Sequence, residues 1–285
     1  IVLNKDSGDL RINLNGYKIV SDSETLRVIQ VTKNSGYAKT ITIDGSKEGS
    51  AIESKYMILG GGDAGAYTLN VLGGTYYGEL RGFVIGQENN ETDGATATFS
   101  GAEINSKGAA IWMSFGENKK MTVDRCTIDA PLGIYAGTTK VNEIIGTTIT
   151  TTGTGIEFKA GTSTVTGCTI TSSNYVEGTA VASNGSGNAE TAITISNQYD
   201  DSDVTVTIDS KSRITNSVSG SKAVFATDGE PNSNVIVNWE GNDDNIGSVY
   251  AKQKWTYPQN SDALNKSDIT NTDGLIIICL LYTSP

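Results

Sequence analysis

The sequence predicts an all-β fold, a right-handed parallel β-helix, and three observations lead to that prediction. Glycine is abundant, at 33 of 285 residues, whereas proline occurs only 4 times. Threonine, serine and asparagine fill much of the rest together with valine and isoleucine, and β-branched side chains favour strands over helices. Short segments recur with a period of about 21–25 residues, which is typical of a solenoid in which each repeat forms one coil.

One recurring strand ends on isoleucine and can be followed through successive segments. Segments 123–128, 144–149 and 165–170 align without gaps, so their closing isoleucines are evenly spaced along the chain. The same frame fits segment 99–104, which ends on Ile104, and segment 72–77, which ends on Tyr77. Because equivalent strands of a solenoid stack on one another, each segment is predicted to occupy the same place in its coil.

A second strand recurs between these copies and places Ile111, Ile134 and Ile156 in equivalent positions. Segments 179–181 and 222–224 resemble later copies, with insertions between them. A leucine-rich repeat has a similar period, but it requires a leucine-rich consensus that this chain lacks. A β-sandwich would show hairpin turns about every 8–12 residues without identity between successive repeats. The repeats therefore favour the β-helix over both alternatives.

The β-helix is predicted to occupy residues 1–238. Its opening coil is expected at 9–19, where apolar and polar side chains alternate before an Asn-Gly turn. Further strands are expected at 28–31, 41–43, 204–208 and 235–237. Residues 239–274 have the composition of loops and are predicted to be an irregular end segment or a linker.

The C-terminal segment 275–285 has a separate interpretation. It begins with the most apolar run in the chain, which is too short to span a membrane. Its last residues, Cys279–Pro285, resemble the in-frame translation of a transposon-derived sequencing adapter. We therefore expect this segment to be a truncated or artefactual tail, and we expect the natural protein to continue beyond it.

Two of the three cysteines, Cys126 and Cys168, occupy equivalent positions two coils apart. Stacked coils are about 4.8 Å apart, which puts these residues roughly 10 Å from one another and beyond disulfide reach. Both are predicted to be buried fillers in an inward ladder with Thr147. The residues that follow them, Thr127, Thr148 and Thr169, are predicted to form an outward ladder.

Charge and composition exclude several classes of function. The formal net charge is −11, and such a surface repels phosphate backbones, so nucleic acid is not expected as a partner. Histidine is absent, which removes the Ser-His and Cys-His nucleophile pairs and most zinc sites. Catalysis would have to use carboxylates, lysine, arginine or tyrosine. No metal or cofactor is predicted.

The residue pattern of successive coils resembles that of bacterial adhesin-like surface proteins built on a pectate-lyase-like parallel β-helix. The likeness rests on the opening coil at 9–19 and on Gly155–Gly161 followed by 164–170, and it extends over roughly residues 9–240. The resemblance implies a β-helix that is extracellular or displayed at the cell surface, with glycans or a host surface as partners. It carries no active-site residue across to this chain.

One candidate binding site follows from the register of the second strand. If its isoleucines point inward, Trp112, Tyr135 and Glu157 point outward on successive coils. Two aromatic rings about 5 Å apart beside a carboxylate could form a platform for a sugar ring, with Lys159 near its edge. The alternative is ordinary stacking of surface side chains between coils.

Two further possibilities are weaker. The acidic residues at 200–203 and 243–244 could bind calcium, but they lack the spacing of known calcium loops, which favours a solvated acidic loop. Polysaccharide lyases and glycoside hydrolases also occur on this fold. The motifs expected of polygalacturonase-like enzymes, Asn-x-Asp, Asp-Asp, Gly-His-Gly and Arg-x-Lys on consecutive coils, do not appear. We therefore expect a structural or adhesive module, and the alternative is a carbohydrate-active enzyme with a degenerate or truncated site.

Overall fold

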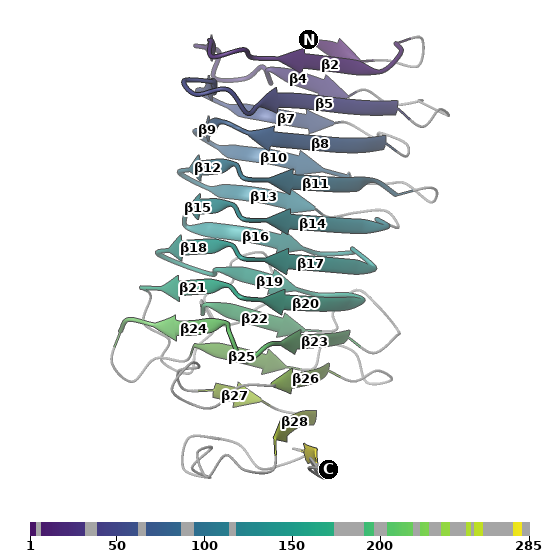
Figure 1. Cartoon of the computed structure of the whole chain (residues 1–285), viewed down its shortest axis with the longest axis vertical. Coiled ribbons are helices and arrows are strands. Elements are labelled where there is room, and N and C mark those ends of the chain that lie inside the picture. The colour runs from purple at the N-terminus through teal and green to yellow at the C-terminus, as the bar shows by residue number, and fades with distance from the viewer. Residues whose placement is uncertain are drawn as a thin grey trace.

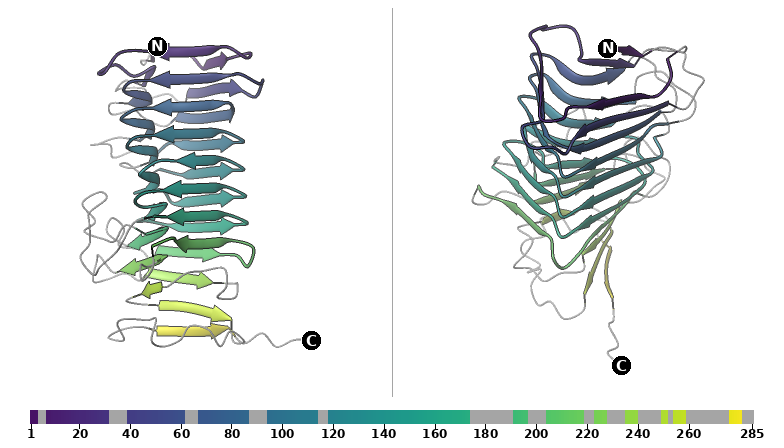
Figure 2. Two further views of the ribbon diagram at one scale, coloured as in Figure 1. Left: turned by 90° about the vertical axis from the view of Figure 1, so that its left-hand side faces the viewer. Right: turned by 45° about the horizontal axis from the view of Figure 1, so that its top comes forward.

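The computed structural model shows a chain wound into a right-handed parallel β-helix (Figure 1). The structure describes residues 1–3, 7–31, 39–61, 67–86, 94–113, 118–173, 191–196, 204–218, 223–227, 235–239, 249–251, 254–258 and 276–280. In the regular coils the chain passes from sheet A to sheet B to sheet C before it starts the next coil. Figure 2 shows the coils stacked along the long axis of the molecule. The fold predicted from the repeats is confirmed.

All three sheets are built from parallel strands taken from successive coils. Sheet A contains β1 (Val2–Leu3), β4 (Ile29–Val31), β7 (Met57–Gly61), β10 (Arg81–Ile85), β13 (Ala109–Met113), β16 (Leu132–Ala136), β19 (Ile156–Phe158), β22 (Ile193–Ser196), β25 (Val224–Thr227) and β27 (Val249–Ala251). Sheet B contains β2 (Leu10–Asn13), β5 (Lys39–Gly45), β8 (Tyr67–Gly73), β11 (Thr96–Ser100), β14 (Lys120–Asp124), β17 (Val141–Ile145), β20 (Thr162–Thr166), β23 (Val204–Ile208), β26 (Val235–Trp239), β28 (Lys254–Pro258) and β29 (Ile276–Leu280). Sheet C contains β3 (Lys18–Ser21), β6 (Ala51–Ser54), β9 (Thr75–Gly78), β12 (Glu103–Ser106), β15 (Thr127–Asp129), β18 (Thr148–Thr151), β21 (Thr169–Ser172) and β24 (Arg213–Asn216).

The core is a set of ladders that run along the axis. In sheet C, one fully buried residue from each strand after β3 stacks on its counterpart in the next coil: Ile52, Tyr76, Ile104, Ile128, Ile149, Ile170 and Ile214. Sheet A contributes a matching ladder through Ile111, Ile134 and Ile156. Each such side chain contributes roughly 1.5–3 kcal/mol through burial. The alignment of the closing isoleucines from Ile104 to Ile170, and the second recurring strand, are therefore confirmed.

Tight corners join sheet B to sheet C. From β11 to β21 each corner takes two residues, and the first has a positive φ: Gly101 (63°), Arg125 (50°), Gly146 (52°) and Gly167 (61°). Glycine adopts this conformation without a steric penalty, whereas Arg125 does so at a cost of roughly 1–2 kcal/mol. The second corner residue is small and turned inward.

The inward corner ladder contains Cys126, Thr147 and Cys168, as predicted. Both cysteines are free and buried, so the prediction of buried fillers without a disulfide is confirmed. The Thr147 hydroxyl donates to the Ile145 carbonyl oxygen (2.9 Å) and accepts from the Cys126 amide (3.3 Å). Burial raises the pKa of the Cys126 thiol to about 11, and it raises the pKa of the Cys168 thiol as well. Neither thiol is a nucleophile at neutral pH.

One predicted alignment is wrong by a single residue. The predicted alignment of segment 72–77 matches Tyr77 with Ile104, but the structure pairs Tyr76 with Ile104 and Leu72 with Ser100. A slip of one residue in a strand exchanges its inward and outward faces. The reason is that Tyr76 fills the position that isoleucine occupies in the later coils, and it packs edge-on against Phe83 at 5.5 Å.

The strand expected at 179–181 is also corrected. Those residues lie outside the described part of the chain, and the place beside β19 in sheet A is taken by β22, where Ile193 pairs with Ile156. Val224 follows in the same ladder, so the copy expected at 222–224 is confirmed. The repeat period does not predict where the next strand begins when an insertion of unknown length separates two coils. The sequence alignment therefore selects the nearest similar segment, 179–181.

The division into 1–238, 239–274 and 275–285 stays a prediction. Within the second segment, the described residues include β27 and β28, which pair with β25 and β26. Within the third, β29 pairs with β28. In the part of the chain that the structure describes, no helix is long and apolar enough to cross a membrane.

Candidate functional site

The predicted aromatic line occupies the outer face of sheet A. Trp112 pairs with Tyr135, and Tyr135 pairs with Glu157, on the neighbouring strands β13, β16 and β19. The rings of Trp112 and Tyr135 are 4.4 Å apart at their centroids and inclined by 36°. The order of these residues along the axis is therefore the one that the register predicted.

Charged groups extend this line at both ends. The Arg81 guanidinium lies 3.9 Å from the centroid of the Trp112 ring, and the Lys159 ammonium lies 5.1 Å from that of Tyr135. The Lys159 ammonium also forms an ion pair with the Glu157 carboxylate at 3.2 Å. Contacts between a cation and an aromatic face contribute about 0.5–2 kcal/mol each, more when they are shielded from water. We call these five residues the charged–aromatic row.

Most of the charged–aromatic row is shielded from solvent. Tyr135 is 2% exposed, Glu157 and Lys159 are fully buried, and Trp112 is partly buried. Sugar platforms need an open ring face. In the conformation described, a ligand reaches none of the row except Trp112 and Arg81. The geometry is that of a stabilised structural cluster, and the assignment of these residues to a glycan site stays a prediction.

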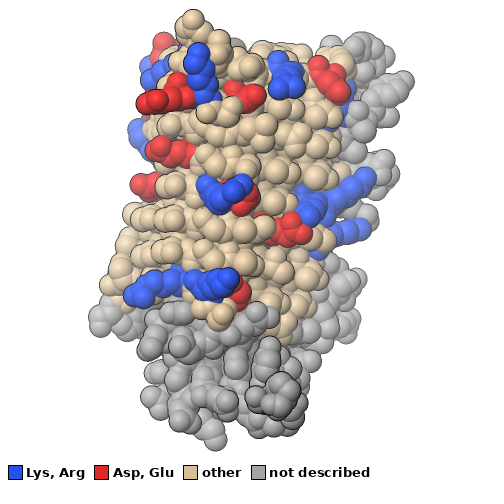
Figure 3. Space-filling model, viewed as in Figure 1, with Lys and Arg blue, Asp and Glu red and all other residues tan. Residues whose placement is uncertain are grey.

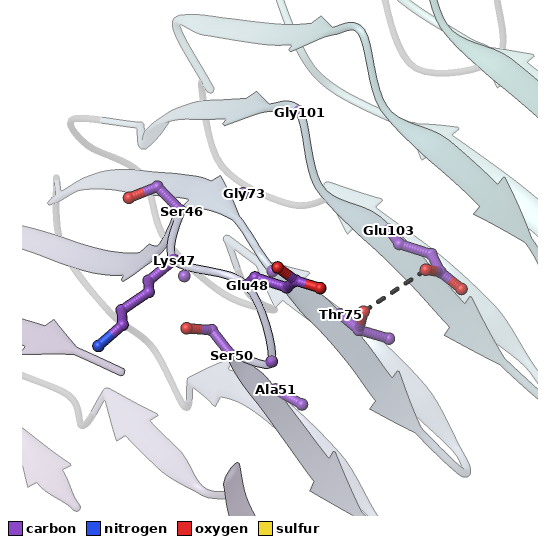
Figure 4. A pocket seen from close by; sticks show the side chains of 12 residues that line it. Ser46, Lys47, Glu48, Ser50, Ala51, Gly73, Thr75, Gly101 and Glu103 are labelled. Atoms are coloured by element: carbon purple, nitrogen blue, oxygen red, sulfur yellow. Dashed lines mark hydrogen bonds between the residues drawn. The ribbon is translucent and has the colours of Figure 1, made fainter. Parts of the chain in front are cut away.

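A second feature lies at the corner between sheets B and C, where the loop of residues 46–50 joins β5 to β6. This loop and the two following coils line an open pocket of about 400 Å³, which we call the corner groove. Its walls are residues 45–51 and 73–75, together with Gly101 and Glu103 (Figure 4). It therefore spans three successive coils.

The polar side chains of the corner groove come from the loop and from sheet C. Glu103 on β12 accepts a hydrogen bond from the Asn105 amide (3.0 Å) and one from the Thr75 hydroxyl (3.4 Å). Glu48 in the loop extends over the groove, so that the two carboxylates flank Thr75 (Figure 4). Among the described residues, Glu48 has no ion-pair or side-chain hydrogen-bond partner. The groove thus combines acceptors and a hydroxyl that could hold the hydroxyl groups of a ligand.

Sequence reasoning missed the corner groove, because glutamate and threonine on the outside of strands carry no signal of their own. One signal was available. The whole of loop 46–50 separates β5 from β6, whereas one or two residues suffice at the equivalent corners from β8 to β21. The acidic residues at 200–203 and 243–244 lie outside the described residues. Within the described part, no group of three or more histidine, cysteine or acidic side chains is arranged to hold a metal ion.

Comparisons with known proteins add no family assignment. No protein-family model matches the chain, and no curated protein and no solved structure matches it either. The fold therefore rests on the strand pairing described above. The likeness to adhesin-like and pectate-lyase-like proteins rests on the residue pattern of the coils alone.

Proposed function

We propose that this chain is a structural and adhesive module of a secreted or cell-surface bacterial protein, in which a stiff rod presents glycan-contacting groups. One observation carries the proposal, namely that among the described residues ten strands pair in succession in sheet A and eleven in sheet B. Nine steps of about 4.8 Å give sheet A a paired length of roughly 43 Å. Because the coils from β1 to β24 pair with their neighbours in all three sheets, groups on these coils keep fixed positions relative to one another.

The outer faces support an adhesive role. In sheet B, one outward ladder contains Thr42, Thr98, Thr122, Thr164 and Thr207, interspersed with Asn70 and Glu143. Figure 3 shows that most of the described surface on the face formed by sheets B and C is uncharged, with the charged side chains in small scattered groups. Hydroxyl groups both donate and accept hydrogen bonds, which suits contact with sugar hydroxyls. An acidic protein with a hydroxyl-rich face is also suited to the medium outside the cell.

The test is a binding screen of the purified chain against immobilised host and dietary glycans, with X-ray scattering to verify the rod shape. We expect binding to a subset of glycans and no change in the glycans after prolonged incubation. Release of reducing ends or unsaturated uronides would instead favour the carbohydrate-active enzyme.

The enzyme is the second candidate, because glycoside hydrolases act through pairs of carboxylates and the corner groove contains Glu48 and Glu103. Failure to bind any glycan, with the rod intact, would leave a structural stalk that positions other domains.

A further inference from the structure

We propose that the corner groove binds the vicinal hydroxyls of a neutral or amino sugar, an inference that rests on the proposed glycan contact and assigns it to named residues. Glu48, Thr75 and Glu103 are the groups that would hold the sugar. A carboxylate accepts two hydrogen bonds from neighbouring hydroxyls, and the threonine hydroxyl can donate or accept. The concave shape would bury part of the ring, which an outward strand face cannot do.

The loop that forms the groove is not needed to turn the chain. At the equivalent corners of the coils from β8 to β21, one or two residues join sheet B to sheet C, and the corners at 14–17 and 209–212 have four residues each. The longer loop 46–50 therefore increases the entropic cost of folding without adding a strand. Insertions on a rigid scaffold are the usual places for binding residues.

The loop is nevertheless held in place at several points. The Ser46 hydroxyl donates to the Asp44 carboxylate at 2.6 Å, and the Gly16 amide donates to the Ser50 hydroxyl at 2.9 Å. Hydrogen bonds from the hydroxyl and amide of Ser46 lower the pKa of the Asp44 carboxyl, so this anchor stays ionised over the neutral range. A loop fixed before the ligand arrives avoids part of the entropic cost of binding.

The same contacts set the charge of the groove. The Lys47 ammonium donates to the Asn15 side-chain oxygen at 3.1 Å, and its side chain extends away from Glu48 (Figure 4). The two carboxylates therefore face the groove without a neutralising cation from the loop. Acidic sugars are repelled by such a site, whereas neutral sugars and protonated amino sugars are accepted.

Glycine leaves room for the ligand in one wall of the groove. A Cβ atom placed on Gly101 would meet no heavy atom within 4 Å, so the space above this residue is open. A sugar ring can approach the backbone there as closely as its own atoms allow. Two carboxylates and one hydroxyl provide fewer oxygen ligands than calcium prefers, which favours a sugar over a metal ion.

The test measures binding of neutral, amino and acidic oligosaccharides to the full chain by calorimetry or ligand-observed NMR. Glu48→Gln and Glu103→Gln keep the shape of each side chain and remove its charge. Each is expected to weaken binding of the neutral or amino sugar about tenfold or more, because hydrogen bonds to charged groups are the stronger ones. Glu79→Gln, the same change on an exposed carboxylate outside the groove, is the matched control and leaves the affinity unchanged. Circular dichroism verifies that each variant keeps its fold.

Three outcomes overturn this assignment. If a glycan binds the parent and binds both variants equally well, the groove is not the site, although the adhesive function stands. If the variants abolish terbium or calcium binding but leave sugar binding intact, the groove is a cation site. If no glycan binds the parent at all, the proposed adhesive function fails and the groove assignment fails with it.

Discussion

Removing one charge of the buried ion pair in the charged–aromatic row is expected to lower the free energy of unfolding strongly. Replacing both charges by neutral side chains is expected to change it little. The Lys159 ammonium and the Glu157 carboxylate are 3.2 Å apart, and both side chains are fully buried. At an effective dielectric constant of about 20, this separation corresponds to an attraction of about 5 kcal/mol. The desolvation of two charges offsets much of that attraction. The change to make is Glu157→Gln, which keeps the volume and removes the negative charge.

The structure predicts a loss of about 3–5 kcal/mol for Glu157→Gln, because it leaves the Lys159 ammonium buried beside a neutral group. The double variant Glu157→Gln/Lys159→Met removes both charges and keeps the volume, so its stability should return to within about 1–2 kcal/mol of the parent. A positive coupling between the two changes is therefore the signature of a shielded pair.

Hydrogen exchange measures this effect locally, which matters because long repeat arrays do not always unfold as one unit. The Lys159 amide donates to the Ala136 carbonyl oxygen at 3.0 Å across β16 and β19 and reports on opening at this place. Its protection should fall by about 100- to 4,000-fold in Glu157→Gln, the equivalent of about 3–5 kcal/mol, and recover in the double variant. A loss below about 1 kcal/mol in the single variant would show that water reaches the pair, because exposed pairs contribute no more than that.

Three further predictions concern the core and the corners. Ile149→Ala should destabilise the chain by about 2–5 kcal/mol, seen as a lower denaturation midpoint, because it opens a cavity in the sheet C ladder. Gly167→Ala should cost about 1–2 kcal/mol through its φ of 61° alone, since nothing lies within 4 Å of the new Cβ. Because burial raises the folded pKa of Cys126 to about 11, the folded state retains that proton while the unfolded thiol loses it near pH ~8.5. The thiol's contribution to the free energy of unfolding is complete below that pH and is lost between about pH 8.5 and 11, by up to about 3 kcal/mol. The free energy of unfolding of Cys126→Ala should therefore depend less on pH in the alkaline range than that of the parent. A parent curve as flat as that of the variant would contradict the burial.

The core of this fold could be predicted from the sequence because the coils repeat. Isoleucine at 128, 149 and 170 marks one place on each coil, and identical neighbours leave little freedom in the register. The register was lost where the marker changed, since Tyr76 replaces isoleucine and Tyr77 beside it has the same apolar character. It was lost again where an insertion separates β19 from β22, because alignment cannot measure the length of an excursion.

The sites were less accessible for a different physical reason. Strand alternation correctly placed Trp112, Tyr135 and Glu157 on the outer face of sheet A, but alternation says nothing about whether an outer face is covered. The full burial of Glu157 and Lys159 depends on three-dimensional packing that no single strand encodes. Likewise, Glu48 and Glu103 are far apart in the sequence, and only the stacking of coils brings them to one groove.

Function in such a solenoid is best sought where the chain departs from its own repeat. A regular coil already satisfies its backbone and buries its ladder, so a loop longer than the corner requires, or a charge placed in a dry position, lowers stability without improving the fold. Departures of this kind persist in natural sequences chiefly at functional sites. The corner groove and the charged–aromatic row are two such departures, and they lie on different sheets. Substitutions in one should leave the other unchanged, because sites without shared contacts contribute additively. Glycan binding that responds to Glu48 but not to Glu157 would therefore assign recognition to the groove and exclude the row from it.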